Sequence, residues 1–283
     1  MKDLTVLVPT TIMDIAAAIK SCKCDCILLA GGTDLLVNKN NELEKCSVII
    51  DLSKVEEMNF IQVMEEELRI GANTTFTEIA ESELARKYGR ALTQSAGLVG
   101  SPQIRNRATI GGNVANCSPA ADSIPPLIAL GAAVGIMNCE GIRQRVSIEE
   151  FLGSWENELK RAGFFIEYFG IPIEKEIGWS GFSRIGARSE VSISKLSIAL
   201  AFHIDGNGRI RNPKIGLGAV GKTAIRAVNV EDLINGRFFN EELVADLGSA
   251  LAVELKESLK GRASMNYKKL AILGVVQDLY TKQ

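Results

Sequence analysis

Ala30-Gly31-Gly32-Thr33-Asp34-Leu35 is a glycine-rich turn, and Thr109-Ile110-Gly111-Gly112-Asn113-Val114 is a second of the same kind. Each follows an apolar or β-branched stretch and places a Gly-Gly pair before small polar residues. Because glycine adopts positive φ and lets the backbone approach a ligand, successive amide N–H groups can face one concavity that binds phosphate oxygens. Thr33 and Asn113 add side-chain donors, and Asp34 can accept from a hydroxyl or orient its loop. The pair of turns favours a ligand with two phosphates, held from both sides.

The surroundings of the second turn support this interpretation, since a single Gly-Gly pair is as often a plain tight turn. Residues 101–108 precede it and residues 115–127 follow it, and both segments are rich in small residues and punctuated by proline. Proline fixes φ and removes a donor, which predicts a defined irregular path. Long ordered loops of this kind are usually functional.

The same stretches resemble a known family. The first turn, residues 104–113 and Ser118-Pro119-Ala120-Ala121-Asp122 are similar to the FAD-binding subunit of the molybdenum hydroxylases, which include xanthine, carbon monoxide and nicotinate dehydrogenases. The resemblance continues through residues 181–188 and 215–220 and ends near residues 262–268. It therefore covers nearly the whole chain, in order.

The resemblance implies an α+β fold, the FAD-binding fold of the p-cresol methylhydroxylase type with a C-terminal antiparallel sheet-and-helix domain. We expect an FAD-binding domain over residues 1–175, with two α/β subdomains of about 1–55 and 56–175. A C-terminal domain of the molybdenum-hydroxylase flavoprotein type is expected over residues 176–283, with FAD in the cleft between the parts.

Hydrophobic periodicity and turn residues predict compatible elements. Helices are expected over 14–20, 78–87 (capped by Thr75 or Thr77), a stretch before Ser101, 149–152, 230–234, 241–257 and 266–280. Strands are expected over 26–29, 48–51, 60–63, 67–70, within 132–148, and over 164–171, 180–185, 198–204 and 209–217. Asp205-Gly206-Asn207-Gly208 predicts a hairpin turn between the last two strands.

The resemblance also implies which residues hold FAD. Two diphosphate loops, a segment along the cofactor, positions near the ribityl chain or the diphosphate, an apolar adenine contact and a cation near the flavin are expected. The loop residues are Leu28, Leu29, Ala30, Gly31, Gly32, Thr33, Asp34 and Leu35 in the first loop and Thr109, Ile110, Gly111, Gly112 and Asn113 in the second. The resemblance places Val99, Gly100 and Ile104 along the cofactor, and Ser118 and Asp122 near the ribityl chain or the diphosphate. It places Ile166 against the adenine and Arg184 near the flavin. An aspartate beside a diphosphate is repulsive unless it accepts a hydrogen bond, so Asp122 should bind a hydroxyl or hold its loop.

The cation near the flavin is a departure from the family pattern. Relatives often place a lysine within the segment that corresponds to residues 182–188, where this chain offers Ser183 and Arg184. A cation beside the N1–C2=O edge of flavin would stabilise the reduced anion and raise the reduction potential. The alternative is that Arg184 and Arg188 form surface or interdomain ion pairs.

No catalytic triad, paired acid or zinc motif is visible, and no catalytic residue is expected on this chain. The resemblance implies that a large subunit hydroxylates the substrate at a molybdopterin cofactor and a small subunit carries [2Fe-2S] clusters. This chain would pass electrons through FAD to NAD or another acceptor, within a dimer of heterotrimers. Flavin suits this junction because it accepts electrons singly and delivers two.

Two alternatives remain open. One is a self-sufficient FAD-dependent reductase or oxidase on the same fold, similar to the enolpyruvyl-UDP-sugar reductases, which would need a proton donor within the chain. The other is a module that has kept the fold and binds no flavin.

Composition excludes other classes of protein. The chain has 283 residues, 46% of them hydrophobic, with 32 basic and 34 acidic residues and a net charge of −2, so no nucleic-acid surface is expected. The most apolar stretch, residues 124–137, is interrupted by Pro125-Pro126 and is too short to span a bilayer. The first residues do not read as a signal peptide, so we expect a cytoplasmic protein.

The cysteines and the single histidine predict no metal site and no covalent flavin. Cys22, Cys24 and Cys26 alternate, but C-x-C-x-C lacks the usual C-x₂-C ligand spacing and has no obvious fourth ligand. Reduced thiols are the expectation, with an iron–sulfur cluster as the alternative. Some members of the superfamily tether FAD through histidine. Here His203 lies in an apolar strand and is expected to be structural, so FAD should be bound non-covalently.

Overall fold

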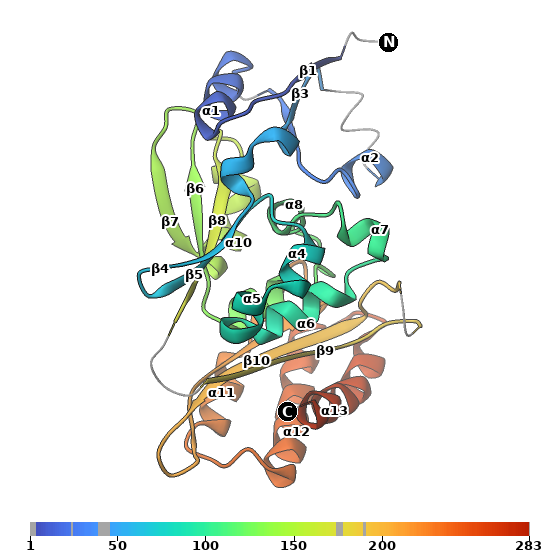
Figure 1. Ribbon diagram of the computed structural model, residues 1–283. Helices are drawn as coiled ribbons and strands as arrows, with labels where there is room; N and C mark the ends of the chain where they lie inside the picture. Colours follow the sequence, from blue (N-terminus) through green and yellow to red (C-terminus); the bar gives the residue numbers. More distant parts are fainter. Residues whose placement is uncertain (1–3, 24, 39–45, 174–177, 189–190, 283) are drawn as a thin grey trace.

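Three sheets and the helices that cover them are arranged along the chain in the computed structural model (Figure 1), which describes residues 4–23, 25–38, 46–173, 178–188 and 191–282. The first sheet is parallel, with the order β1 (Thr5–Leu7), β3 (Val48–Asp51), β2 (Ile27–Leu29). Helix α1 (Ile12–Ser21) begins at Thr11, which forms a capping box with Asp14. Strand β2 leads into the first glycine turn and the short helix α2 (Leu35–Asn38).

The second sheet is antiparallel throughout and shares one hydrophobic core with the first sheet and α1. Its order is β4 (Ile61–Met64), β5 (Glu67–Gly71), β8 (Phe165–Pro172), β6 (Ala133–Met137), β7 (Arg143–Ser147). The helices of this part are α4 (Phe76–Glu81), α5 (Glu83–Tyr88), α6 (Arg90–Leu98), α7 (Pro102–Arg105), α8 (Ile110–Ala115), α9 (Ile124–Ala129) and α10 (Ile148–Ser154). Two 3-10 turns, Leu52–Lys54 and Glu56–Met58, and a π turn, Trp155–Leu159, complete it.

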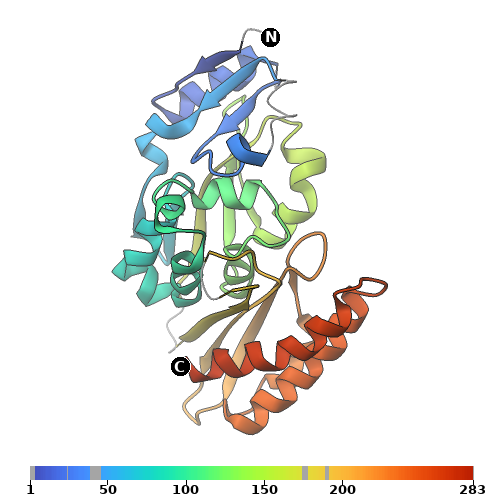
Figure 2. The same cartoon turned by 90° about the vertical axis from the view of Figure 1, so that its right-hand side faces the viewer.

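The third sheet has its own core and lies at the C-terminal end of the chain. Its order is β12 (Ile225–Arg226), β11 (Ile210–Gly218), β10 (Leu196–Ile204), β9 (Gly178–Ile185), all antiparallel. Helices α12 (Glu241–Ser258) and α13 (Met265–Thr281) run side by side along one face, as Figure 2 shows, and α11 (Val228–Ile234) packs beside them.

The other face of the third sheet joins the two halves of the chain. Small buried side chains of α6, α9 and the sheet form the contact, among them Ala91, Ala129 and Ala199 around Phe182. On β11 the backbone itself touches α9, because a Cβ at Gly216 would lie 2.9 Å from the Pro125 carbonyl carbon. Such close packing fixes how the C-terminal part meets the rest.

Most of the expected elements are confirmed, and one helix is wrong. Residues 78–87 form two helices instead of one, because α4 ends at Ser82 and the Ser82 hydroxyl caps α5 by accepting from Ala85 N at 3.1 Å. Thr75 is the cap of α4, as one of the two expected alternatives. Within the described ranges, none of the helices combines the length and the hydropathy that a membrane span needs.

Candidate functional site

A cavity of about 540 Å³ opens where the first two sheets, the two glycine turns and the loop after β9 meet. Its volume lies in the range typical of small-molecule and cofactor sites. Most of the expected site residues line it: Leu28, Leu29, Ala30, Gly31, Gly32, Thr33, Asp34, Leu35, Val99, Gly100, Thr109, Gly111, Gly112, Asn113, Ser118, Asp122, Ile166 and Arg184.

Ile104 and Ile110 do not line the cavity. Ile110 is fully buried beneath the second turn, whereas Ile104 is 37% exposed on α7. The Ile104 side chain covers Gly100, which has a φ of +49°. Both residues therefore support the walls of the cavity from behind.

The first glycine turn offers backbone donors to a ligand. Gly32 has a φ of +74°, and no residue that the structure describes accepts a hydrogen bond from the N–H groups of Gly31, Gly32 or Thr33. Successive unpaired N–H groups of this kind form a concavity suited to phosphate oxygens. Gly31 has a further role, since a Cβ there would overlap the Arg107 carbonyl group, whose carbon would be 2.7 Å away.

The second glycine turn does not form the expected nest. Its N–H groups are used within the protein: Ile110 donates to Thr74 O at 3.0 Å, Gly111 to Ala72 O at 2.8 Å, and Gly112 to the Thr109 hydroxyl at 3.1 Å. The turn is the start of α8, with Thr109 as its cap. The chain between β5 and α4 brings the accepting carbonyl groups to it.

What the second turn offers the cavity is the side chain of Asn113. Its Oδ1 accepts from the Ser123 hydroxyl at 2.7 Å, which leaves the NH₂ group of this cavity-lining residue as a donor. The two turns thus differ in kind, one presenting backbone N–H groups and the other a side-chain amide.

One end of the cavity is apolar, and its residues were largely missed in the sequence. The side chains there come from α1, from β2 and the residue before it, from the two 3-10 turns, from the π turn, and from the start of β8 and the residue before it: Ile19, Cys26, Ile27, Leu52, Met58, Trp155, Phe164 and Phe165, beside the expected Ile166. Trp155 is held by stacking on Phe151, with ring centroids 4.9 Å apart, and by donating from Nε1 to Ala115 O at 2.9 Å. No local signal marks Trp155, because its place depends on a π turn. Lys160, which ends that turn, also lines the cavity.

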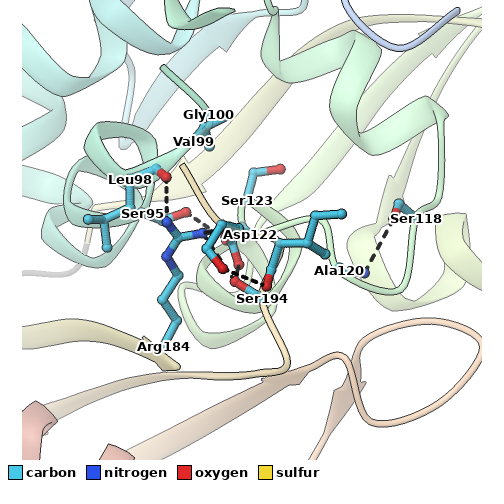
Figure 3. Close-up of polar contacts among 12 residues, drawn as sticks. Ser95, Leu98, Val99, Gly100, Ser118, Ala120, Asp122, Ser123, Arg184 and Ser194 are labelled. Carbon is cyan, nitrogen blue, oxygen red and sulfur yellow. Dashed lines mark hydrogen bonds and ion pairs between the residues drawn. The ribbon is translucent and has the colours of Figure 1, made fainter. Parts of the chain in front are cut away.

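The other end is polar and is built around Arg184 (Figure 3). Arg184 Nη1 donates to Asp122 Oδ2 at 2.7 Å, to Ser192 O at 3.0 Å and to the Ser194 hydroxyl at 3.2 Å, while Nη2 donates to Leu98 O at 2.7 Å. The Arg184 and Asp122 side chains are only 9% and 6% exposed. Arg184 therefore forms a nearly buried ion pair with Asp122 and also lines the cavity.

Asp122 accepts a hydrogen bond from a hydroxyl group and helps to hold its loop, as expected. The Ser194 hydroxyl donates to Oδ1 at 2.6 Å, and the Ser95 hydroxyl donates to the Asp122 backbone carbonyl, also at 2.6 Å. Burial raises the pKa of Asp122 above its usual value, although the Ser194 hydroxyl and the Arg184 guanidinium oppose that change.

The remaining candidates lie elsewhere. Ser183 donates from its hydroxyl to Asp278 Oδ2 at 2.6 Å on α13, and exposed Arg188 donates to Val191 O at 3.0 Å. His203 is not among the described residues that line the cavity. Cys22 is a free thiol, Cys24 lies outside the described residues, and the described part of the chain holds no cluster of His, Cys, Asp and Glu able to bind a metal ion.

Comparison with known proteins identifies this arrangement. Residues 2–174 match the family described as the FAD binding domain in molybdopterin dehydrogenase, and residues 182–283 match the CO dehydrogenase flavoprotein C-terminal domain. Fold and site together thus define an FAD-binding component of an oxidoreductase. The chain belongs to the family of FAD-binding subunits of the molybdenum hydroxylases, which confirms the resemblance seen in the sequence.

Individual relatives agree. The nicotinate dehydrogenase FAD-subunit of Eubacterium barkeri is 30% identical over 284 residues, covering 99% of this chain and 96% of that protein. The xanthine dehydrogenase FAD-binding subunit of Escherichia coli O157:H7 is 28% identical over 85% of this chain and 82% of that protein. A chain of carbon monoxide dehydrogenase from Hydrogenophaga pseudoflava, 23% identical, superposes with a TM-score of 0.87 over 99% of this chain and 96% of that chain. The expected fold class is confirmed.

Proposed function

We propose that this chain carries electrons in a multi-subunit molybdenum hydroxylase, taking them from [2Fe-2S] clusters and passing them through non-covalently bound FAD to NAD or another acceptor. The molybdopterin cofactor and the clusters would belong to a large and a small partner subunit, in a dimer of heterotrimers. The observation that carries the proposal is one cavity lined by three kinds of groups: N–H donors of the first turn that have no acceptor among the described residues, apolar side chains such as Trp155 and Ile166, and the nearly buried Arg184–Asp122 pair.

The residues present fit FAD. The N–H groups of Gly31, Gly32 and Thr33 would hold the diphosphate, with the Asn113 amide as a further donor. Apolar Ile166 and Trp155 would take the adenine, which leaves the flavin for the end that Val99, Gly100 and Asp122 line. Bound FAD supplies the exchange between single electrons and electron pairs.

This chain's own residues would bind, orient and shield the cofactor. At the flavin end the two charged side chains, Arg184 and Asp122, are bonded to each other and nearly buried, so they contribute structure and electrostatics. We further propose the division into an FAD-binding domain, residues 1–175 with subdomains of about 1–55 and 56–175, and a C-terminal domain, residues 176–283, that closes the cavity over its flavin end.

The first test is the visible spectrum of the purified chain, before and after denaturation and filtration. A flavin spectrum that passes into the filtrate, with the mass of FAD, is expected. A colourless chain that stays colourless after incubation with FAD would overturn the proposal. Purification from the source without iron–sulfur and molybdopterin partners would overturn its electron-transfer part, and steady turnover of a small substrate with NADPH by the chain alone would favour a self-sufficient reductase.

Placement of the cofactor is tested by tryptophan fluorescence, since the sequence has only two tryptophans, Trp155 and Trp179. Trp155 lines the cavity, whereas Trp179 packs against Phe202 and Phe239 in the C-terminal part. Titration of the cofactor-free chain with FAD should quench the emission of the Trp179→Phe variant strongly and that of the Trp155→Phe variant much less. Equal quenching in both variants would contradict the placement of the adenine end.

A further inference from the structure

Arg184 links three segments of the cavity wall by hydrogen bonds. Its guanidinium donates to Leu98 O, just before Val99 and Gly100, to the Asp122 carboxylate, and to Ser192 O in the loop after β9 (Figure 3). Every one of these segments lines the flavin end of the cavity. Arg184 thus has two separate properties, its positive charge and the hydrogen bonds that tether the three segments, and different substitutions can remove each of them.

The charge of Arg184 is balanced at close range. Asp122 Oδ2 lies 2.7 Å from Nη1, and both side chains are almost completely buried. In a medium of low dielectric constant a lone guanidinium would act strongly on a neighbouring flavin, whereas a close pair of opposite charges acts as a dipole whose field falls off faster. The cation that the sequence suggested beside the flavin is thus present but electrically compensated.

We propose that Asp122 tunes the flavin by neutralising Arg184, so that the reduction potential stays below the value that an uncompensated guanidinium would impose. The inference rests on the proposed function, because it requires FAD in the cavity with the flavin at this end. Asp122 acts on the flavin indirectly, because it weakens the electrostatic field of Arg184; it is therefore a positioning residue. A protein sets the reduction potential of a bound flavin in part through the charge that it places near the flavin ring, because that charge stabilises or destabilises the reduced flavin.

The experiment measures the midpoint potential of FAD bound to the full chain by dye-coupled reductive titration. Asp122→Asn keeps the shape of the side chain and an acceptor oxygen for Arg184 but removes the negative charge, so an upward shift of the potential is expected. Arg184→Gln leaves the carboxylate uncompensated and should shift the potential downward. The double variant has neither charge and should return close to the wild-type value.

Two further variants separate charge from tethering. Arg184→Lys keeps the positive charge but cannot reach Leu98 O, Ser192 O and Asp122 together, so its potential should stay near the wild-type value even where FAD binds more weakly. Glu231→Gln is the matched control, since Glu231 is 5% exposed and accepts from Arg226 Nη2 at 2.8 Å in a pair that does not line the cavity. Its potential should not change.

An unchanged or lowered potential in FAD-loaded Asp122→Asn would overturn the inference, as would an Arg184→Lys variant that behaves like Arg184→Gln. Should Asp122→Asn fail to fold, as judged by circular dichroism, the comparison of Arg184→Lys with Arg184→Gln carries the same decision. Failure of the wild-type chain itself to bind FAD would contradict the proposed function and is recognised separately, in the filtrate assay.

Discussion

Gly31 illustrates how one residue serves both the fold and the cofactor site. Its N–H group belongs to the unpaired donors of the first turn, while its missing side chain lets the turn approach residues 107–108, so that a Cβ would be 2.9 Å from the Ala108 Cα. The sequence pointed to the glycine for the first reason only. The second could not be foreseen, because the contacting segment lies more than seventy residues away.

We predict that Gly31→Ala lowers both stability and FAD retention. The added methyl group forces the first turn away from the Arg107 carbonyl, and overpacking of this kind typically costs about 1–3 kcal/mol. Urea unfolding measures the stability, and the flavin absorbance per chain after desalting measures the retention.

The matched control is Gly97→Ala on α6, where a Cβ would have no neighbour within 4 Å. Alanine is the better helix former, so this variant should be as stable as the wild type or up to about 1 kcal/mol more stable, with unchanged FAD content. Equal behaviour of the two variants would show that the contact of Gly31 with residues 107–108 is unimportant.

At the scale of elements, the start of α4 supports the second glycine turn. Thr75 forms an isolated antiparallel bridge with Thr109, and Phe76 N donates to Ala108 O at 3.0 Å. Thr75 also forms a capping box with Glu78, whose carboxylate accepts hydrogen bonds from Thr75 N at 2.7 Å and from Asn59 Nδ2 at 3.1 Å. Holding this helix end therefore also holds the loop that meets Gly31.

The capping box predicts a pH dependence. Burial raises the pKa of Glu78, but the hydrogen bonds from Thr75 and Asn59 outweigh burial and leave it below the usual value. A lowered pKa means that the stabilisation is complete above the unfolded-state value of about 4.3 and is lost as the pH falls through the folded-state value. Glu78→Gln should therefore flatten the loss of stability that accompanies a fall in pH below the unfolded-state value of about 4.3.

The measurement is the urea midpoint as a function of pH, compared with Glu81→Gln, an exposed carboxyl group on the same helix. The Glu81 variant should follow the wild-type curve. Parallel curves for wild type and Glu78→Gln would show that the capping box does not contribute to acid unfolding.

Elements with a strong local signal could be predicted from the sequence, and contacts between elements could not. Hydrophobic periodicity and turn residues predict the strand that leads into the first turn and the Asp205–Gly208 hairpin turn. The second turn shows the limit. Its Gly-Gly pair looks like the first, yet its N–H groups are satisfied by Ala72 and Thr74, whose approach depends on how β5 joins α4. In the same way, Asp122 and Arg184 are 62 positions apart, and only the packing of two parts of the chain reveals that they form a pair.

At the scale of the whole molecule, one cavity is lined by residues from two parts of the chain, each with its own hydrophobic core. Trp155 and the glycine turns belong to the first part, and Arg184, Ser192 and Ser194 belong to the C-terminal part. A ligand that touches walls from both parts stabilises both against unfolding. One that touches only the first part would leave the unfolding of the C-terminal part unchanged.

Fluorescence of the two tryptophans can measure the unfolding of the two parts separately, because each tryptophan lies in one part. In Trp155→Phe the remaining Trp179 reports on the C-terminal part, and in Trp179→Phe the remaining Trp155 reports on the first. Ligand at 100 times its Kd adds about 2.7 kcal/mol to the free energy of unfolding of whatever it stabilises. With that concentration of FAD, the urea midpoints of both reporters should rise together, since Arg184 links Leu98 and Asp122 to the loop after β9. A rise for Trp155 alone would show that the C-terminal part does not form a wall of the cofactor site, and would place the flavin end away from Arg184.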